Sequence, residues 1–122
     1  MLQGVYLMNY NEIFKLTADT RWNVVAQDEN MWRVGVYHPE YNNAREIDRL
    51  EKHSCPELFI CIGGQCGLLL REGNREHQLI MNPLEAIMVT SYHNGFKVDK
   101  DGFFIVAERT DFTTHFIERD KP

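Results

Sequence analysis

The sequence predicts a single-domain, all-β protein of the barrel or jelly-roll type. Short β-prone runs are separated by turn residues about every 8 to 12 residues, and no helical periodicity of useful length is present. The 122 residues suffice for one hydrophobic core and are too few for two. A hydrophobic content of 43% and a charged content of 25% are ordinary for a globular protein, so disorder is not expected.

The first predicted element of the barrel is a hairpin. Residues 1–21 are interpreted as an N-terminal arm that packs on a partner subunit, and residues 22–122 as the barrel domain. Residues 22–26 and 31–37 read as strands, and polar residues 27–30 form the turn between them. In the second run Arg33 and Tyr37 share one face. They either face solvent behind an apolar core face, or line a cavity and bind a substrate anion.

The segment of residues 51–70, EKHSCPELFICIGGQCGLLL, follows a polar loop (residues 39–50) and carries most of the chemistry. If this segment begins as one strand, its side chains alternate between the two faces of the sheet. Six of them then share one face: Glu51, His53, Cys55, Glu57, Phe59 and Cys61. Two carboxylates, an imidazole and a thiol are costly to bury unpaired, and a bound divalent metal would remove that cost. Cys55 is either a further ligand or a packing thiol, and Pro56 can turn it away.

The remaining elements are predicted from turn residues and β-prone runs. Residues 66–71 and 75–81 form a hairpin around the turn at 72–74, and residues 84–89 form a mostly apolar strand. Residues 90–95 are a polar cluster that places His93 at the rim of the sheet. Residues 103–109 and 112–117 complete a set of about eight strands. His38, His77 and His115 are expected in loops or facing solvent.

Charge and cysteine content limit the partners and the compartment. A formal charge of −5 without clustered Lys or Arg argues against nucleic acid or an anionic membrane as the main partner. Three cysteines, with no signal-peptide core at the start and no run of about 18 apolar residues, predict a cytoplasmic protein with reduced thiols. Their spacing, Cys-x5-Cys-x4-Cys, matches no zinc-knuckle pattern.

The central segment resembles the first motif of the cupin superfamily, G-x5-H-x-H-x3,4-E-x6-G. Glu57 and Gly64 fit its E-x6-G half, and His53, four residues before Glu57, matches its second histidine. Glu51 stands where the first histidine belongs, and Arg45 where the leading glycine belongs.

Residues 82–89 resemble the second cupin motif more weakly, and His93 matches the metal-binding histidine of that motif. The resemblance implies a cupin-like jelly roll, also called a double-stranded β-helix barrel. It further implies a divalent metal site built from Glu51, His53, Glu57 and His93. Mixed imidazole and carboxylate ligands suit Fe, Mn, Zn or Ni, and the extra carboxylate disfavours Cu. A homodimer is expected from the resemblance and from the edge strands that a small open barrel must cover.

Three functional hypotheses remain open. The first is a metal-dependent enzyme acting on a small polar molecule that Arg33, Tyr37 and Tyr92 orient; dioxygenase, isomerase and decarboxylase are not separated. The second is a non-catalytic ligand-binding or sensor module, in which His53 and His93 only donate or accept hydrogen bonds. The third is a metal-free sugar isomerase or epimerase with His93 as base and Tyr92 as acid, although adjacent strand residues point to opposite faces.

Overall fold

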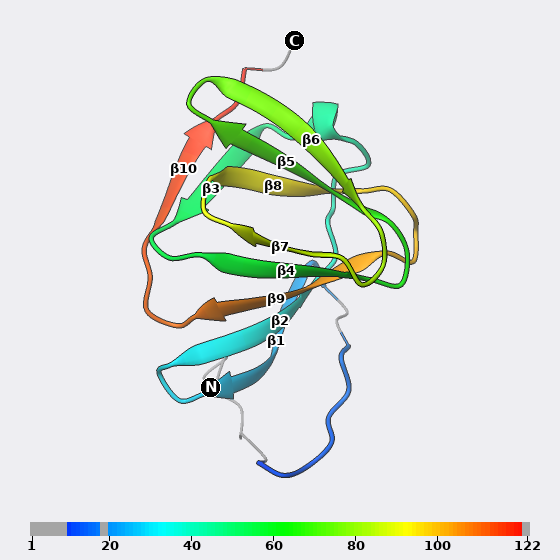
Figure 1. Ribbon diagram of the computed structural model, residues 1–122, viewed down its shortest axis with the longest axis vertical. Coiled ribbons are helices and arrows are strands. Elements are labelled where there is room, and N and C mark those ends of the chain that lie inside the picture. The colour runs from blue at the N-terminus through cyan, green and yellow to red at the C-terminus, as the bar shows by residue number, and fades with distance from the viewer. Residues whose placement is uncertain (1–9, 18–19, 121–122) are drawn as a thin grey trace.

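The computed structural model describes residues 10–17 and 20–120, and over these ranges the regular secondary structure is almost entirely β-strand (Figure 1). The elements, in chain order, are β1 (Trp22–Asp28), β2 (Trp32–Tyr37), the short 3-10 helix η1 (Ala44–Glu46), β3 (Arg49–His53), β4 (Glu57–Ile62), β5 (Cys66–Glu72), β6 (Arg75–Met81), β7 (Ala86–Val89), β8 (Tyr92–Lys97), β9 (Phe103–Arg109) and β10 (Thr114–Glu118).

The strands form two five-stranded antiparallel sheets. Sheet A has the order β1-β2-β9-β4-β7, and sheet B has the order β10-β3-β8-β5-β6. Figure 1 shows the two sheets stacked one above the other, with long connections passing between them. The predicted all-β jelly roll is confirmed.

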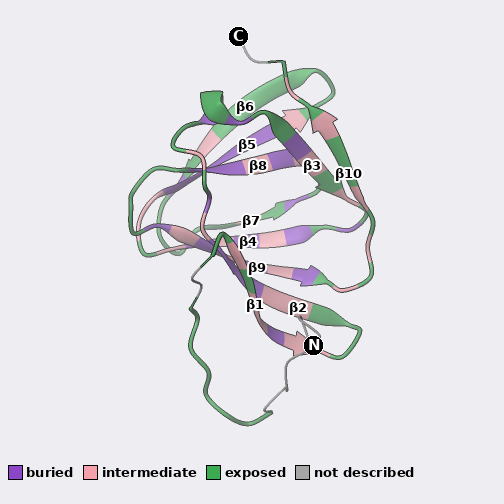
Figure 2. Ribbon diagram, turned by 180° about the vertical axis from the view of Figure 1, so that it is seen from behind, coloured by how far each residue is buried: buried purple, intermediate pink, exposed green. Residues whose placement is uncertain are grey.

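The main core lies between the two sheets because the strands alternate in burial. In β4 the side chains of Glu57, Phe59 and Cys61 are buried, whereas the three residues between them and at the end of the strand are half-buried. Phe59 pairs with Val106 of the neighbouring strand β9, which has the same alternation. A second apolar cluster lies under η1 and covers the opposite face of sheet B (Figure 2). This cluster explains why β5 is buried on both faces.

Two sequence-based interpretations of the strands were wrong. The segment from Glu51 is not one strand: β3 belongs to sheet B and β4 to sheet A, and residues 54–56 carry the chain from one sheet to the other. Pro56, which has no N–H to donate to a ladder, lies in that connection.

The polar run that includes His93 does not lie at the rim of the sheet, as the sequence analysis expected. It begins β8, a central strand of sheet B that pairs with both β3 and β5. The Asn94 side chain has its partner inside the fold, since it donates to the Arg49 carbonyl at 2.9 Å. The described residues therefore contain ten strands, rather than about eight.

Glycine at position 95 lets β8 approach the ring of Tyr37. A Cβ at this position would lie 2.7 Å from the Tyr37 hydroxyl oxygen. The Gly95 N–H instead donates to that oxygen at 3.2 Å. The absence of a side chain at Gly95 thus fixes Tyr37 between the two sheets.

The boundary between an N-terminal arm (residues 1–21) and the barrel domain (residues 22–122) stays a prediction. Strand β1 begins at Trp22, and residues 1–9 and 18–19 of the expected arm lie outside the described residues.

Over the described part of the chain, no helix has the length and apolar character needed to cross a membrane. Cys55, Cys61 and Cys66 are all free and buried.

Candidate metal centre

The candidate metal centre lies at one mouth of the barrel, where strand ends from both sheets meet. His53 ends β3 and Glu57 begins β4, so the turn between these strands places them beside one another. His93 is the second residue of β8, and its partner in the β-ladder is Glu51 of β3. Four side chains from three strands therefore point toward a common volume.

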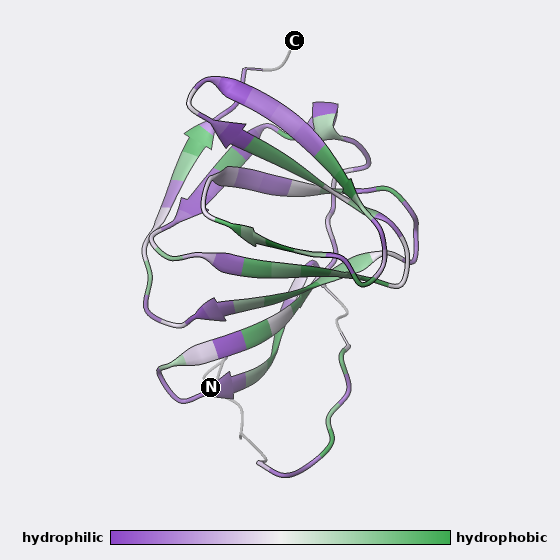
Figure 3. Ribbon diagram, viewed as in Figure 1, coloured by the Kyte–Doolittle hydropathy of each residue, from purple (hydrophilic) through white to green (hydrophobic). Residues whose placement is uncertain are grey.

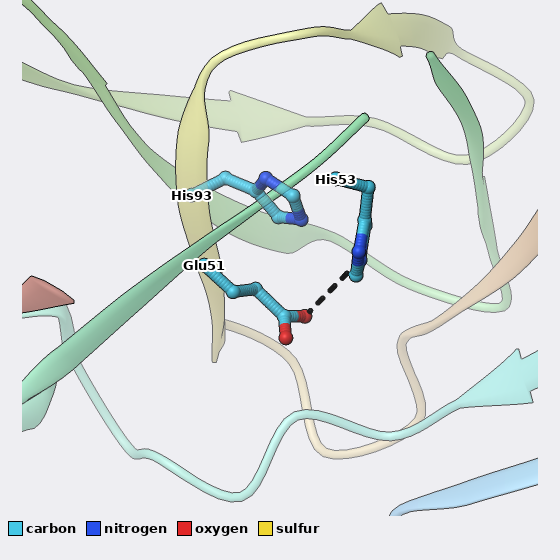
Figure 4. A group of neighbouring side chains, drawn as sticks. All are labelled: Glu51, His53 and His93. Atoms are coloured by element: carbon cyan, nitrogen blue, oxygen red, sulfur yellow. Dashed lines mark ion pairs between the residues drawn. The ribbon is translucent and has the colours of Figure 1, made fainter. Parts of the chain in front are cut away.

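The distances within this group are short. The Oε1 atom of Glu57 lies 3.2 Å from His53 Nε2 and 3.0 Å from His93 Nε2. The Oε1 atom of Glu51 lies 3.7 Å from His53 Nε2. Glu51, His53 and His93 offer ligand atoms that all lie within 4.8 Å of one another, and Figure 4 shows these side chains converging from β3 and β8. The four residues expected as ligands are thus brought together.

In both histidines the ring nitrogen Nδ1 contacts a neighbouring polar group, and this contact fixes the orientation of the ring. His93 Nδ1 lies 2.9 Å from the Ser91 carbonyl oxygen. A carbonyl can only accept, so Nδ1 carries the proton, and in the neutral ring Nε2 presents a lone pair to the cavity. His53 Nδ1 lies 2.8 Å from the Thr114 hydroxyl of β10. Oriented rings of this kind are typical of metal-ligating histidines.

Two atoms of this group are buried without a hydrogen-bond partner: Glu57 Oε1 and His93 Nε2. They lie 3.0 Å apart, a contact that becomes an ion pair when His93 carries a second proton. When His93 is neutral, the carboxylate oxygen faces an imidazole lone pair at this distance, which is unfavourable unless a proton or a metal ion is shared between them. Metal–ligand bonds of about 2.1 Å place adjacent octahedral ligand atoms about 3.0 Å apart. The donor set therefore fits a divalent cation.

The ionisation of the group follows from its charges. Burial by itself would raise the pKa of Glu57, but the imidazoles of His53 and His93 beside it lower this pKa to about 2. Burial would lower the pKa of His53, but the Glu51 and Glu57 carboxylates raise it to about 10. The site is thus strongly anionic in character and favours a positive charge.

A further buried carboxylate, Glu108, was missed by the sequence analysis. It lies near the end of β9, and Arg33 Nε and Nη2 each donate to its Oε2 at 2.7 Å. Glu108, Glu57 and His53 form a second group whose ligand atoms lie within 4.8 Å. Burial, followed by the adjacent Glu57 carboxylate, raises the pKa of Glu108 to about 7, although Arg33 opposes this. The alternation of β9 could have revealed it, since Phe104 and Val106 share its face.

The mouth opens into a cavity of about 230 Å³. Arg33 and Tyr37 both line it, together with Trp22 and Phe112. The Arg33 guanidinium carbon lies 5.9 Å from the centre of the Trp22 ring and 5.4 Å from the centre of the Phe112 ring. The polar face of β2 therefore points into the cavity, as the second of the two interpretations of this run expected.

Other residues singled out in the sequence lie elsewhere. Tyr92 packs against the apolar cluster under η1, and the Lys52 ammonium lies 5.8 Å from its ring centre. Tyr92 is consequently absent from the described lining of the cavity, and it does not pair with His93. Cys55 is buried but belongs to neither ligand group among the described residues. His77 and His115 are exposed.

Comparisons with known proteins show the fold. No protein family model matches the chain, and no curated protein matches it. Hydroxypropylphosphonic acid epoxidase from S. wedmorenis superimposes with a TM-score of 0.55 at 10% identity, over 70% of this chain and 48% of that one. Recombinant oxalate oxidase in complex with glycolate gives a TM-score of 0.52 at 11% identity, over 90% of this chain and 62% of that one. The fold is that of the cupins.

A second structure of the epoxidase, with Co(II) and substrate, gives a TM-score of 0.55 at 11% identity and covers 82% of this chain. The chain spans less than two thirds of the length of these neighbours. At such low identity, the comparison establishes the architecture and leaves the activity to be argued from the site.

Proposed function

We propose that this chain is a divergent member of the cupin superfamily that binds one divalent metal ion through Glu51, His53, Glu57 and His93. The main support is the pair of buried, unpartnered atoms, Glu57 Oε1 and His93 Nε2, 3.0 Å apart. Two imidazole nitrogens and two carboxylate oxygens suit Fe, Mn, Zn or Ni better than Cu. Such an ion would supply Lewis-acid or oxygen-activating chemistry beside the cavity.

The proposed substrate is a small polar molecule with an acidic group. The cavity of about 230 Å³ is smaller than the range of about 300 to 1,000 Å³ that holds drug-sized ligands. Arg33 presents a guanidinium to the cavity between two aromatic rings, and the buried Tyr37 hydroxyl offers a polar group next to Asn94. Arg33 would orient the acidic group, and Tyr37 a second polar atom. The glycolate of the oxalate oxidase neighbour is a ligand of this size and charge.

A non-catalytic binding role would use the same cavity, and only a turnover assay separates it from an enzyme. The metal-free sugar isomerase hypothesis loses its base and acid pair, because Tyr92 packs on the other side of β8 from His93. The homodimer and the cytoplasmic location stay predictions.

Elemental analysis of protein purified without an affinity tag tests the proposal. We expect about one metal ion per chain after reconstitution with Fe, Mn, Zn or Ni. The variants His53→Ala and His93→Ala should each bind at least about tenfold more weakly, since each removes a ligand. His77→Ala, an exposed histidine of β6, is the matched control. Wild-type protein that stays metal-free after reconstitution, or a His77→Ala variant that loses the metal equally, would refute the proposal.

A further inference from the structure

A second cavity, of about 170 Å³, adjoins the metal cavity and has no part in the proposed function. The two cavities have a shared wall formed by five residues: Arg21, Tyr37, Glu51, Asn94 and Phe116. This wall does not seal one cavity from the other at the surface, since the Glu51 side chain is 35% exposed and Phe116 is 51% exposed. One elongated molecule can therefore extend from the metal cavity into the second cavity.

Strand β3 runs along both cavities. Its residues Arg49, Glu51 and His53 share one face, because side chains alternate along a strand. Arg49 lines the second cavity, Glu51 lines both, and His53 lines the metal cavity. At about 3.3 Å per residue, the α-carbons of Arg49 and His53 lie about 13 Å apart. The strand thus presents a guanidinium to the second cavity at a set spacing from the candidate metal ligands.

The Arg49 guanidinium is oriented by an aromatic ring and is not paired with a carboxylate. Its carbon atom lies 4.3 Å from the centre of the Phe116 ring. Among the described residues Arg49 forms no ion pair, not even with Glu118, its partner in the ladder between β3 and β10. A guanidinium placed over an aromatic ring keeps its N–H groups available for an acceptor on a ligand.

The backbone that carries Arg49 is held against the shared wall by hydrogen bonds. The Asn94 side chain donates to the Arg49 carbonyl at 2.9 Å, and the Tyr37 hydroxyl donates to Asn94 Oδ1 at 3.1 Å. Figure 3 shows hydrophilic colouring at the beginning of β8, the strand that contributes Asn94 to the wall. The position of Arg49 relative to the metal cavity is therefore fixed before a ligand binds.

The other charges leave one arginine available to a ligand. Of the three arginines that line the cavities, two are already paired: Arg33 with Glu108 at 2.7 Å, and Arg21 with Glu40 at 3.0 Å. Glu51 contributes a negative charge to both cavities, and a metal ion bound as proposed above offsets it. With the metal ion in place, the second cavity attracts a negatively charged group.

We infer that the second cavity is an anion subsite in which Arg49 binds an acidic group of the substrate. The inference rests on the proposed function and narrows its substrate class to elongated molecules with an acidic group at each end. One acidic group lies at the metal ion and Arg33. The other lies in the second cavity, where the planar guanidinium of Arg49 binds it through two parallel hydrogen bonds. A ligand with a single acidic group leaves Arg49 to water.

Isothermal titration calorimetry of the metal-loaded full chain tests the inference. The probes are glutarate, adipate and suberate, each compared with the monocarboxylate of equal chain length: pentanoate, hexanoate and octanoate. We expect at least one dicarboxylate to bind about tenfold or more tightly than its monocarboxylate, because a hydrogen-bonded pair of charged groups is added. Wild-type protein that binds no dicarboxylate more tightly than its monocarboxylate overturns the inference, and this comparison needs no variant.

Two variants assign the effect to Arg49. Arg49→Gln should reduce the preference for the dicarboxylate to less than about twofold. Arg45→Gln, at an exposed arginine of η1 that is absent from the described lining of either cavity, changes the net charge equally and should keep the preference. Circular dichroism establishes that both variants are folded. A preference that survives Arg49→Gln, or one that Arg45→Gln removes equally, contradicts the assignment of the subsite to Arg49.

Metal content, measured in the same samples, separates this inference from the proposed function. Wild-type protein that holds the metal ion without preferring a dicarboxylate overturns the subsite alone and leaves the metal site in place. Protein that takes up no metal refutes the proposed function, and the inference with it, since Glu51 then keeps its charge beside the second cavity.

Discussion

Replacing Glu57 by Gln tests the role of a single carboxylate oxygen that lies close to two imidazoles. Glu57 Oε1 is 3.2 Å from His53 Nε2 and 3.0 Å from His93 Nε2. Glutamine keeps the shape of the side chain but removes its charge and offers a weaker ligand. We expect Glu57→Gln to fold and to lose most of the stabilisation that a metal ion provides.

The expected magnitude follows from linkage between binding and folding. Metal at about 100 times its dissociation constant stabilises the native state by about 2.7 kcal/mol. For a domain of this size, about 1 kcal/mol corresponds to about 4 °C, so the wild type should melt about 10 °C higher with metal. Loss of a ligand should weaken binding by at least the 10- to 100-fold that loss of an outer hydrogen bond costs. At 100-fold weaker binding the gain falls to about 0.4 kcal/mol, or about 2 °C.

The assay is thermal unfolding followed by circular dichroism, with and without each of Fe, Mn, Zn and Ni, starting from chelator-treated protein. His77→Gln, on the exposed strand β6, is the matched control and should keep the full shift. A Glu57→Gln variant that retains a shift of about 10 °C would show that this carboxylate is not a ligand, and the reasoning from its short contacts would fail.

Further predictions concern acid stability, packing and thiol reactivity. Because the folded-state pKa of Glu57 is lowered from 4.5 to about 2, metal-free protein should have the full stabilisation above pH 4.5. It should lose roughly 3 kcal/mol as the pH falls through 2, as urea titrations would measure; an equal loss in Glu57→Gln would contradict this cause. Gly35→Ala should destabilise the fold by about 1 to 3 kcal/mol, since its Cβ would overlap the Trp22 ring; an unchanged urea midpoint would argue against this packing. Burial raises the pKa of the Cys61 and Cys66 thiols, so both should react with a disulfide reagent only upon unfolding; rapid reaction of the native protein would contradict their burial.

The local parts of the fold could be predicted from the sequence because their signals are local. The hairpin of β5 and β6 was expected from a polar turn between two β-prone runs, and Gly73 adopts the positive φ of 64° that such a turn requires. The strand β9 was expected from its run of β-branched and aromatic residues. In contrast, β8 was missed, because its histidine, asparagine and glycine gain their partners only from other strands.

The contact between His53 and Glu57 shows the limit of sequence reasoning most clearly. On one continuous strand, residues four apart lie about 13 Å from one another, too far to share an ion. Their 3.2 Å approach exists because residues 54–56 turn the chain from sheet B to sheet A. His53 and Glu57 were therefore expected to share a site on an interpretation of the backbone that was wrong.

By itself, the sequence determined the β-architecture and the kinds of donor atom available, since alternation and turn residues act over a few neighbouring positions. Only the tertiary structure decided which donors meet. His93 faces Glu51 through a ladder between β3 and β8, Glu108 enters from β9, and Tyr92 is directed to the opposite side of its strand. These placements depend on pairing between strands far apart in the chain, and that pairing is set by packing of the whole barrel rather than by any local pattern.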